Sequence, residues 1–246
     1  MVLCELLGVP YADHDNFQRL ATARFLANVG GSASLCAISE SLEYFHQLAH
    51  RERKQPGTDL LGMIIREHGD DLSDAELAGL ADGVLSGGLE TTACMLALGT
   101  LVLLRNPAAA RRALSPSAAV DDLVEELLRY LTVGQTAFPR FATRDLELGG
   151  QRIRAGDMLL RSLSGANTGM EPGGFDAERK ASSHLAFGHC IHRCIGAELA
   201  RMELRCAFPA LLRRFPSLRL AVPPEKLAFR RASFVYGLHA LPVLLH

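Results

Sequence analysis

Residues 184–196, which read HLAFGHCIHRCIG, bring three histidines and two cysteines together in a short segment with two glycines. A helix is predicted to follow directly, from about Ala197 to Arg214. Cys194 then lies near a helix N-terminus, where free backbone N–H groups and the helix dipole favour a thiolate, and Arg193 and Arg201 add positive charge. The segment therefore predicts a cysteine that binds a metal or acts as a nucleophile. A structural thiol in a turn is the alternative.

A zinc site is a second alternative for the same segment. Its ligands would be neighbours in one loop, namely His189, Cys190, His192 and Cys194. Neighbouring ligands in one tight loop seldom complete a tetrahedron without a second ligand pair, and the sequence has no C-x-x-C pair. The pattern therefore disfavours zinc.

The composition of the chain narrows the class of protein. Of its 246 residues 48% are hydrophobic, and 26 Lys+Arg against 27 Asp+Glu give a net charge of −1. A packed core is therefore expected, without the positive field that would bind nucleic acid or an anionic membrane. The six cysteines are irregularly spaced and no charged-then-apolar leader precedes Glu5, so the expected location is cytoplasmic. The most apolar stretch, residues 91–104, is too short to span a bilayer, so no membrane anchor is expected.

Helical patterns dominate the chain. Two amphipathic helices are predicted within about residues 12–55, after a break at residues 8–10 and on either side of residues 30–32. Ser73 and Glu76 form a capping box that begins a helix over about residues 74–105, which is roughly 48 Å long at 1.5 Å per residue. A further helix is predicted over about residues 118–130. The segments expected to form strands or ribbons are residues 146–148, 151–154, 157–163, 227–234 and 241–245, so the fold class is mainly α with small β-sheets.

The middle of the long helix contains Gly87 and Gly88. Such a pair costs about 2 kcal/mol relative to two alanines in a helix. A functional role and close helix packing explain it equally well from the sequence alone.

The cysteine segment resembles the haem-ligand loop of the cytochrome P450 monooxygenases, whose pattern is F-G-x-G-x-H-x-C-x-G followed by L-A-R. The matching positions are Phe187, Gly188, His192, Cys194, Gly196 and residues 199–201. Three further motifs occur in the family's order: residues 87–92 (GGLETT) resemble the oxygen-groove motif, Glu126-x-x-Arg129 resembles the E-x-x-R pair, and Arg140 resembles an arginine that holds a haem propionate. The chain is identified as similar to soluble bacterial members of this family.

The resemblance implies haem b as the cofactor, with Cys194 as the axial thiolate ligand of the iron. His192 and Arg140 would pair with the haem propionates. Phe187 would limit solvent access to the sulfur, and Gly188 and Gly196 would let the backbone approach the porphyrin.

On the other face of the haem, the resemblance implies that Glu90 and Thr91 deliver protons to reduced dioxygen, with room for gas and water at Gly87 and Gly88. Glu126 and Arg129 would form a structural ion pair. The implied reaction inserts one oxygen atom of O2 into a small organic substrate. The electrons would come from a ferredoxin or flavoprotein reductase and ultimately from NAD(P)H.

The implied architecture is one partial domain over residues 1–246, the C-terminal portion of the family's fold, with lid helices at about 12–55. The family's domain is longer, and the missing part is expected at the N-terminus. Cys190 stands at a glycine position where a positive φ is possible, and Pro209 is expected to interrupt the helix after the ligand loop. Residues 168–174 form a shortened segment in which Gly174 replaces an arginine. A truncated, non-catalytic remnant that acts as an interaction module is therefore the alternative function.

Overall fold

The computed structural model describes residues 2–25, 31–169, 174–230 and 233–246. Parts of three expected features lie outside this set: the helix boundary at 26–30, the shortened segment at 170–173 and the ribbon at 231–232. Within the described residues the chain is mostly helical, as predicted. It divides into two compact units, residues 1–94 with 230–235, and residues 95–229 with 236–246. A single domain over residues 1–246 stays a prediction.

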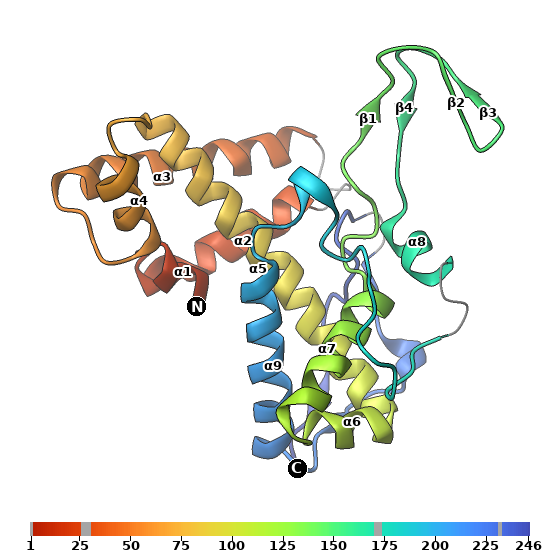
Figure 1. Cartoon of the computed structure of the whole chain (residues 1–246). Helices are drawn as coiled ribbons and strands as arrows, with labels where there is room; N and C mark the ends of the chain where they lie inside the picture. The colour runs from red at the N-terminus through yellow and green to blue at the C-terminus, as the bar shows by residue number, and fades with distance from the viewer. Residues whose placement is uncertain (1, 26–30, 170–173, 231–232) are drawn as a thin grey trace. The chain divides into compact units, whose positions relative to one another are not determined.

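The first unit is built from helices. They are α1 (Val2–Leu6), the 3-10 turn η1 (Tyr11–Asp13), α2 (His14–Phe25), α3 (Gly31–Lys54), α4 (Leu60–His68) and the first part of α5 (Asp74–Arg105). The helices α2 and α3, drawn in red to orange in Figure 1, pack against each other, and the rings of Phe17 and Phe45 lie 5.3 Å apart between them. The predicted pair of amphipathic helices is confirmed, whereas α4 was not anticipated.

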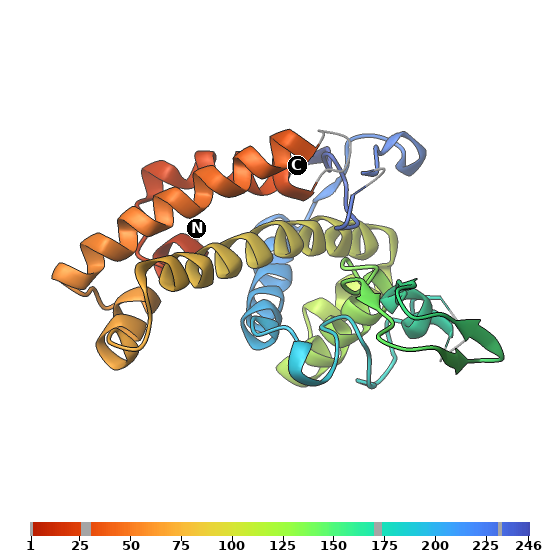
Figure 2. The same ribbon diagram turned by 90° about the horizontal axis from the view of Figure 1, so that it is seen from above.

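The start of α5 is the predicted capping box. The N–H of Ser73 donates to Glu76 Oε2 at 2.8 Å and the N–H of Glu76 donates to Ser73 Oγ at 3.2 Å. The helix ends at Arg105, and Asn106 caps the next helix, α6 (Pro107–Ala113). Figure 2 shows α5 as one continuous helix.

By length and apolar composition, α5 is a candidate membrane span, contrary to the expectation based on residues 91–104 alone. A core helix of a globular protein has the same composition. Several of its large side chains, Leu77, Leu85, Leu98 and Leu103, are buried in the protein. We therefore describe α5 as a core helix.

The second unit is organised around α7 (Ser117–Leu131) and α9 (Ala197–Arg214), which pack against each other and against α6. Leu123, Leu127 and Phe208 are completely or almost completely buried. The expectation that Pro209 interrupts α9 is wrong, because the helix runs unbroken from Ala197 to Arg214 with Pro209 inside it and buried. Burial of the proline ring offsets the missing backbone hydrogen bond.

Among the described residues the strands form three two-stranded antiparallel sheets. The strand β2 (Leu146–Leu148) pairs with β3 (Gln151–Ile153) across the Gly149-Gly150 turn, whose φ values of 58° and 76° suit glycine. The strand β1 (Arg140–Phe141) pairs with β4 (Met158–Leu159).

Two strand predictions need correction. The strand expected over residues 157–163 ends at Leu159, and a helix that was not predicted, α8 (Leu163–Gly169), begins at its far end. The C-terminal strand β6 (Val243–Leu244) pairs with β5 (Arg219–Leu220), which is the strand that follows α9 along the chain. The ribbon expected at 227–234 contributes, in its described part, an isolated bridge from Phe229 to Leu238. Strand pairing depends on long-range contacts, which hydrophobic patterns do not specify.

Candidate functional site

The cysteine loop leads from the 3-10 turn η3 (Cys190–His192) into α9. Cys194 is exposed, and its N–H donates to the carbonyl of Phe187 at 2.8 Å, which closes the loop. Gly196 caps α9, and its carbonyl accepts the N–H of Ala200 at 2.9 Å. Phe187, Gly188, His192, Cys194 and Gly196 are thus brought together in one ordered loop, which presents the Cys194 thiol to solvent.

Two residues of this loop have a left-handed backbone. Gly188 has a φ of 71°, and a Cβ there would lie 3.3 Å from the His192 carbonyl oxygen. Cys190 has a φ of 58°, which confirms the positive φ considered from the sequence. A side chain in this conformation strains the backbone, whereas glycine adopts it freely. The loop therefore carries local strain at Cys190.

We predict that Cys190→Gly raises the free energy of unfolding by about 1 kcal/mol, because it removes this strain. The measurement is urea unfolding of both proteins under reducing conditions. Cys36→Gly is the matched control: Cys36 is also exposed but lies inside α3, where glycine should destabilise by about 1 kcal/mol. Equal or lower stability of Cys190→Gly would show that the loop has adapted to cysteine.

A charged network lies directly behind the loop. Arg201 on α9 donates to both carboxylate oxygens of Glu125 on α7, at 2.6 and 2.9 Å, and His184 Nε2 lies 3.0 Å from Glu125 Oε2. The Arg201 guanidinium carbon also lies 4.7 Å from the ring centroid of Phe187. The network therefore ties the start of the loop to two helices.

Arg193 and Arg201, which were expected to add positive charge beside Cys194, both have carboxylate partners. Both arginines also contact Glu198, at 3.3 and 2.8 Å respectively. Their charges are balanced by carboxylates, Glu125 among them. Only the folded structure brings Glu125 within reach, since it is 76 residues from Arg201 in the sequence.

Burial tends to raise the pKa of Glu125, but the hydrogen bonds and charges of His184 and Arg201 outweigh this and lower the pKa to about 2 from its ordinary 4.5. A carboxyl group with a lowered pKa in the folded state stabilises the protein above its unfolded pKa. We therefore predict that stability falls as the pH drops from about 4.5 to about 2, and that Glu125→Gln lacks this part of the dependence. Urea unfolding across this pH range tests it, with the exposed Glu147→Gln as control. An identical pH dependence of the wild type and Glu125→Gln would contradict the prediction.

Glu126 and Arg129 form a buried ion pair, with contacts of 2.7 and 2.9 Å, and each is 2% exposed. The carbonyls of Asn167 and Gly174 accept hydrogen bonds from Arg129, at 2.9 and 3.4 Å. The expected loss of an arginine at Gly174 does not leave the cluster one cation short, because Arg179 Nε lies 3.1 Å from Glu126. Arg179 was not among the residues predicted from the sequence.

Arg140 lies on β1 and is half-buried, with Nη1 3.5 Å from the Pro139 carbonyl oxygen. His192 is exposed within η3. Both side chains belong to the second unit, as does the cysteine loop.

The motif in α5 belongs to the first unit and has two distinct parts. Gly88 lies close to Leu3, because a Cβ there would come within 2.8 Å of Leu3 Cδ1 and displace that side chain, whereas a Cβ at Gly87 would meet nothing within 4 Å. Thr91 Oγ1 donates to the Gly87 carbonyl at 2.5 Å. The helix is continuous here. Close packing against Leu3 therefore applies to Gly88, and Gly87 is the position with free space.

Glu90 is 3% exposed and forms an ion pair with Arg230, from the segment after α9. Arg230 was not among the residues predicted from the sequence. The sequence did indicate that Glu90 has a cationic partner, because a carboxylate on a buried helix needs a cation to remain charged. The position of that cation is a tertiary feature.

The zinc alternative is not supported. His189, Cys190, His192 and Cys194 all lie in the part of the chain that the structure describes. In that part no three His, Cys, Asp or Glu side chains converge in a way that could hold a metal ion.

Comparison with known proteins identifies relatives over almost the whole chain. The family model described as Cytochrome P450 matches residues 118–231. Cytochrome P450-SU2 of Streptomyces griseolus is 43% identical over 99% of this chain and 61% of that protein. Mycinamicin IV hydroxylase/epoxidase of Micromonospora griseorubida is 39% identical over 99% of this chain and 63% of that protein.

Among solved structures, CYP105P1 in complex with filipin I superposes with a TM-score of 0.93 at 40% identity, over 100% of this chain and 64% of that one. The chain thus spans less than two thirds of these relatives and corresponds to the C-terminal portion of their fold. Sequence identity of about 40%, the shared fold and the ordered cysteine loop agree, and the chain belongs to the cytochrome P450 family.

Proposed function

We propose that this chain carries the haem-ligand half of a monooxygenase, with Cys194 as the axial ligand of haem b. The observation that carries the proposal is the exposed Cys194 thiol, held at the start of α9 by the hydrogen bond from its own N–H to Phe187. Relatives named as a hydroxylase/epoxidase and an N-oxygenase support a reaction that adds oxygen to an organic molecule.

The residues of the cysteine loop are chemically suited to bind haem b. A soft thiolate donor suits iron, and Gly188 and Gly196 leave the backbone of the loop free of side chains on either side of Cys194. Arg140 and His192 supply cationic or hydrogen-bonding groups for the two propionates. When bound, haem b supplies the iron at which dioxygen is activated. The electrons would come from NAD(P)H through a ferredoxin or flavoprotein reductase, in the cytoplasm.

Glu90 and Thr91 are proposed to hold and pass protons on the oxygen-binding side. Arg230 pairs with the Glu90 carboxylate inside the protein, and the Gly87 carbonyl orients the Thr91 hydroxyl. The open space at Gly87 leaves room beside that hydroxyl.

In a version of the enzyme that turns over substrate, we predict that Thr91→Ala leaves haem binding intact but diverts reduced dioxygen to hydrogen peroxide, because proton delivery is lost. The product formed per NAD(P)H consumed should fall about tenfold or more, the range that loss of general acid catalysis supports. Thr91→Ser keeps the hydroxyl and is the control that should restore coupling. Unchanged coupling in Thr91→Ala would remove Thr91 from the proposed proton path.

The direct test of the proposal is the haem content and absorbance spectrum of the purified chain. One haem per chain and a red-shifted absorption of the reduced protein under carbon monoxide are expected from a thiolate ligand. A folded chain that takes up no haem would favour the alternative, a non-catalytic remnant that acts as an interaction module.

A further inference from the structure

The ring of Phe187, at the start of the cysteine loop, is held by two neighbouring side chains. The guanidinium carbon of Arg201 lies 4.7 Å from the centroid of this ring, and the centroid of the His184 ring lies 6.2 Å from it. A guanidinium above an aromatic face is attracted by the electrons of the ring. The orientation of Phe187 therefore depends on where Arg201 and His184 are held.

A single carboxylate holds both of these side chains. Glu125 Oε1 accepts from Arg201 Nε at 2.6 Å, and Glu125 Oε2 accepts from Arg201 Nη2 at 2.9 Å. The side chains of Arg201, Glu125 and His184 are 13%, 14% and 3% exposed. Paired contacts between a guanidinium and a carboxylate fix the plane of the guanidinium. Glu125 thus sets the plane that faces Phe187.

The hydrogen bonds of His184 locate its ring proton. The N–H of Ala186 donates to His184 Nδ1 at 3.2 Å, so Nδ1 is an acceptor and the proton lies on Nε2. Nε2 then donates to Glu125 Oε2, which is 3.0 Å away. The imidazole is held at both nitrogens, and its orientation beside Phe187 is fixed as well.

The helices that carry the network are joined by other contacts. α7, which carries Glu125, packs against α9, which carries Arg201. Arg205 of α9 also pairs with Asp121 of α7, with an N–O distance of 2.9 Å. Glu125 is therefore not needed to join α7 to α9, and its distinct contribution is the contact with the cysteine loop.

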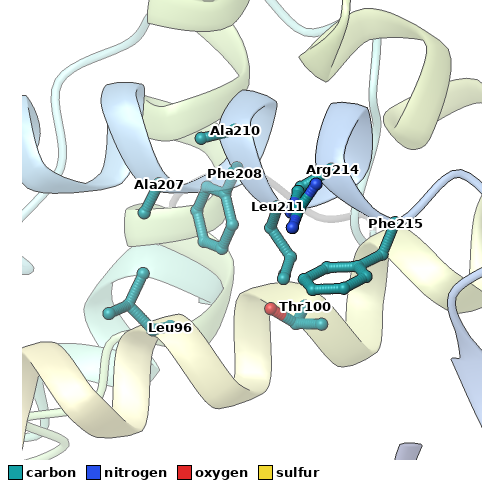
Figure 3. Close-up of a pocket in the computed structure, with 8 residues that line it drawn as sticks. All are labelled: Leu96, Thr100, Ala207, Phe208, Ala210, Leu211, Arg214 and Phe215. Atoms are coloured by element: carbon teal, nitrogen blue, oxygen red, sulfur yellow. The ribbon is translucent and has the colours of Figure 1, made fainter. Parts of the chain in front are cut away.

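The far half of α9 is anchored on α5. Figure 3 shows Phe208 and Leu211 pointing from α9 toward α5. The ring of Phe208 lies so close to Gly99 of α5 that a Cβ there would collide with it. Arg201 therefore extends from a helix that is held firmly on two sides, which makes it a fixed support for the loop.

Phe187 in turn positions Cys194. The carbonyl of Phe187 accepts the N–H of Cys194 at 2.8 Å, and this bond closes the loop. A continuous set of contacts thus leads from Glu125, through Arg201 and His184, to the backbone of Cys194. We propose that Glu125 is a positioning residue for Cys194. The inference rests on the proposed function, in which Cys194 is the axial ligand of haem b.

Glu125→Gln tests the proposal in the haem-free chain. Each oxygen of Glu125 accepts from at least one donor, so the NH2 group of glutamine faces a donor in either orientation. The N–H of Cys194 should therefore exchange with deuterium about tenfold or more faster than in the wild type. The measurement is amide hydrogen exchange of the full chain at neutral pH, followed by NMR. The N–H of Leu123, which is completely buried on α7, reports global unfolding and should be accelerated less.

Two matched variants assign the effect to the network. Glu198 also contacts Arg201, at 2.8 Å, but its side chain is 73% exposed. Glu198→Gln should therefore change the exchange of the Cys194 N–H by less than about threefold. Arg201→Lys keeps the charge but loses the planar fork that faces Glu125 and Phe187, so it should accelerate exchange as Glu125→Gln does.

Protein loaded with haem gives a second readout, the reduction potential. A loosely held Phe187 admits water to the sulfur, and hydrogen bonds from water weaken the donation of electrons by a thiolate. The potential of Glu125→Gln should therefore rise, while that of Glu198→Gln should equal the wild-type value. A role in general stability alone would not move the potential.

Three results would overturn the proposal. They are an unchanged exchange rate of the Cys194 N–H in Glu125→Gln, an equal acceleration at Cys194 and Leu123, and an unchanged potential in the loaded variant. A chain that takes up no haem would contradict the proposed function instead, and hydrogen exchange would then decide the role of Glu125 by itself.

Discussion

Replacing Cys194 by alanine is expected to abolish the red-shifted absorption of the reduced, carbon monoxide-bound protein. The physical reason is that the shift reports a thiolate ligand, and alanine supplies none. Haem content per chain should also fall by about tenfold or more, because the axial bond is lost. The measurement is a difference spectrum, together with the haem-to-protein ratio, on protein loaded with haem.

Cys190→Ala is the matched control for this experiment. Cys190 is the other exposed thiol of the same loop, and its replacement should leave the thiolate spectrum unchanged. If Cys194→Ala kept the spectrum and Cys190→Ala lost it, Cys190 would be the ligand. The circular dichroism of both variants should match the wild type, since neither thiol belongs to the buried core.

Glu126→Gln is expected to lower the free energy of unfolding by about 3 to 5 kcal/mol, the cost of leaving a buried charge without its partner. Glu126 accepts from Arg129 and from the N–H of Asp176, and contacts Arg179. Glutamine has nearly the same volume, so the loss reports charge rather than packing. Urea unfolding at neutral pH measures it.

Two further variants separate this effect from general damage. Glu147→Gln, on an exposed strand, should change stability by less than about 0.5 kcal/mol. The double variant Glu126→Gln/Arg129→Met should recover part of the loss, because it also removes the uncompensated Arg129 charge. A loss below about 1 kcal/mol in Glu126→Gln would show that Arg129 finds adequate partners in the Asn167 and Gly174 carbonyls.

The sequence determined the features that rest on neighbouring residues. The start of α5 follows from Ser73 and Glu76, and its end from Asn106 and Pro107, because caps bond only to the adjacent turn. The β2–β3 turn follows from two glycines, and the cysteine loop follows from the spacing of its own residues. Backbone conformation at these points is fixed by interactions a few residues apart.

The tertiary structure alone decided which distant residues meet. Arg179 joins Glu126, Arg230 joins Glu90, and Leu3 fills the space above Gly88. The tertiary structure also decided that β5 pairs with β6 and that α9 continues unbroken at Pro209. Charges and apolar groups have many possible partners along a chain, and only the packed core selects among them by burial and shape.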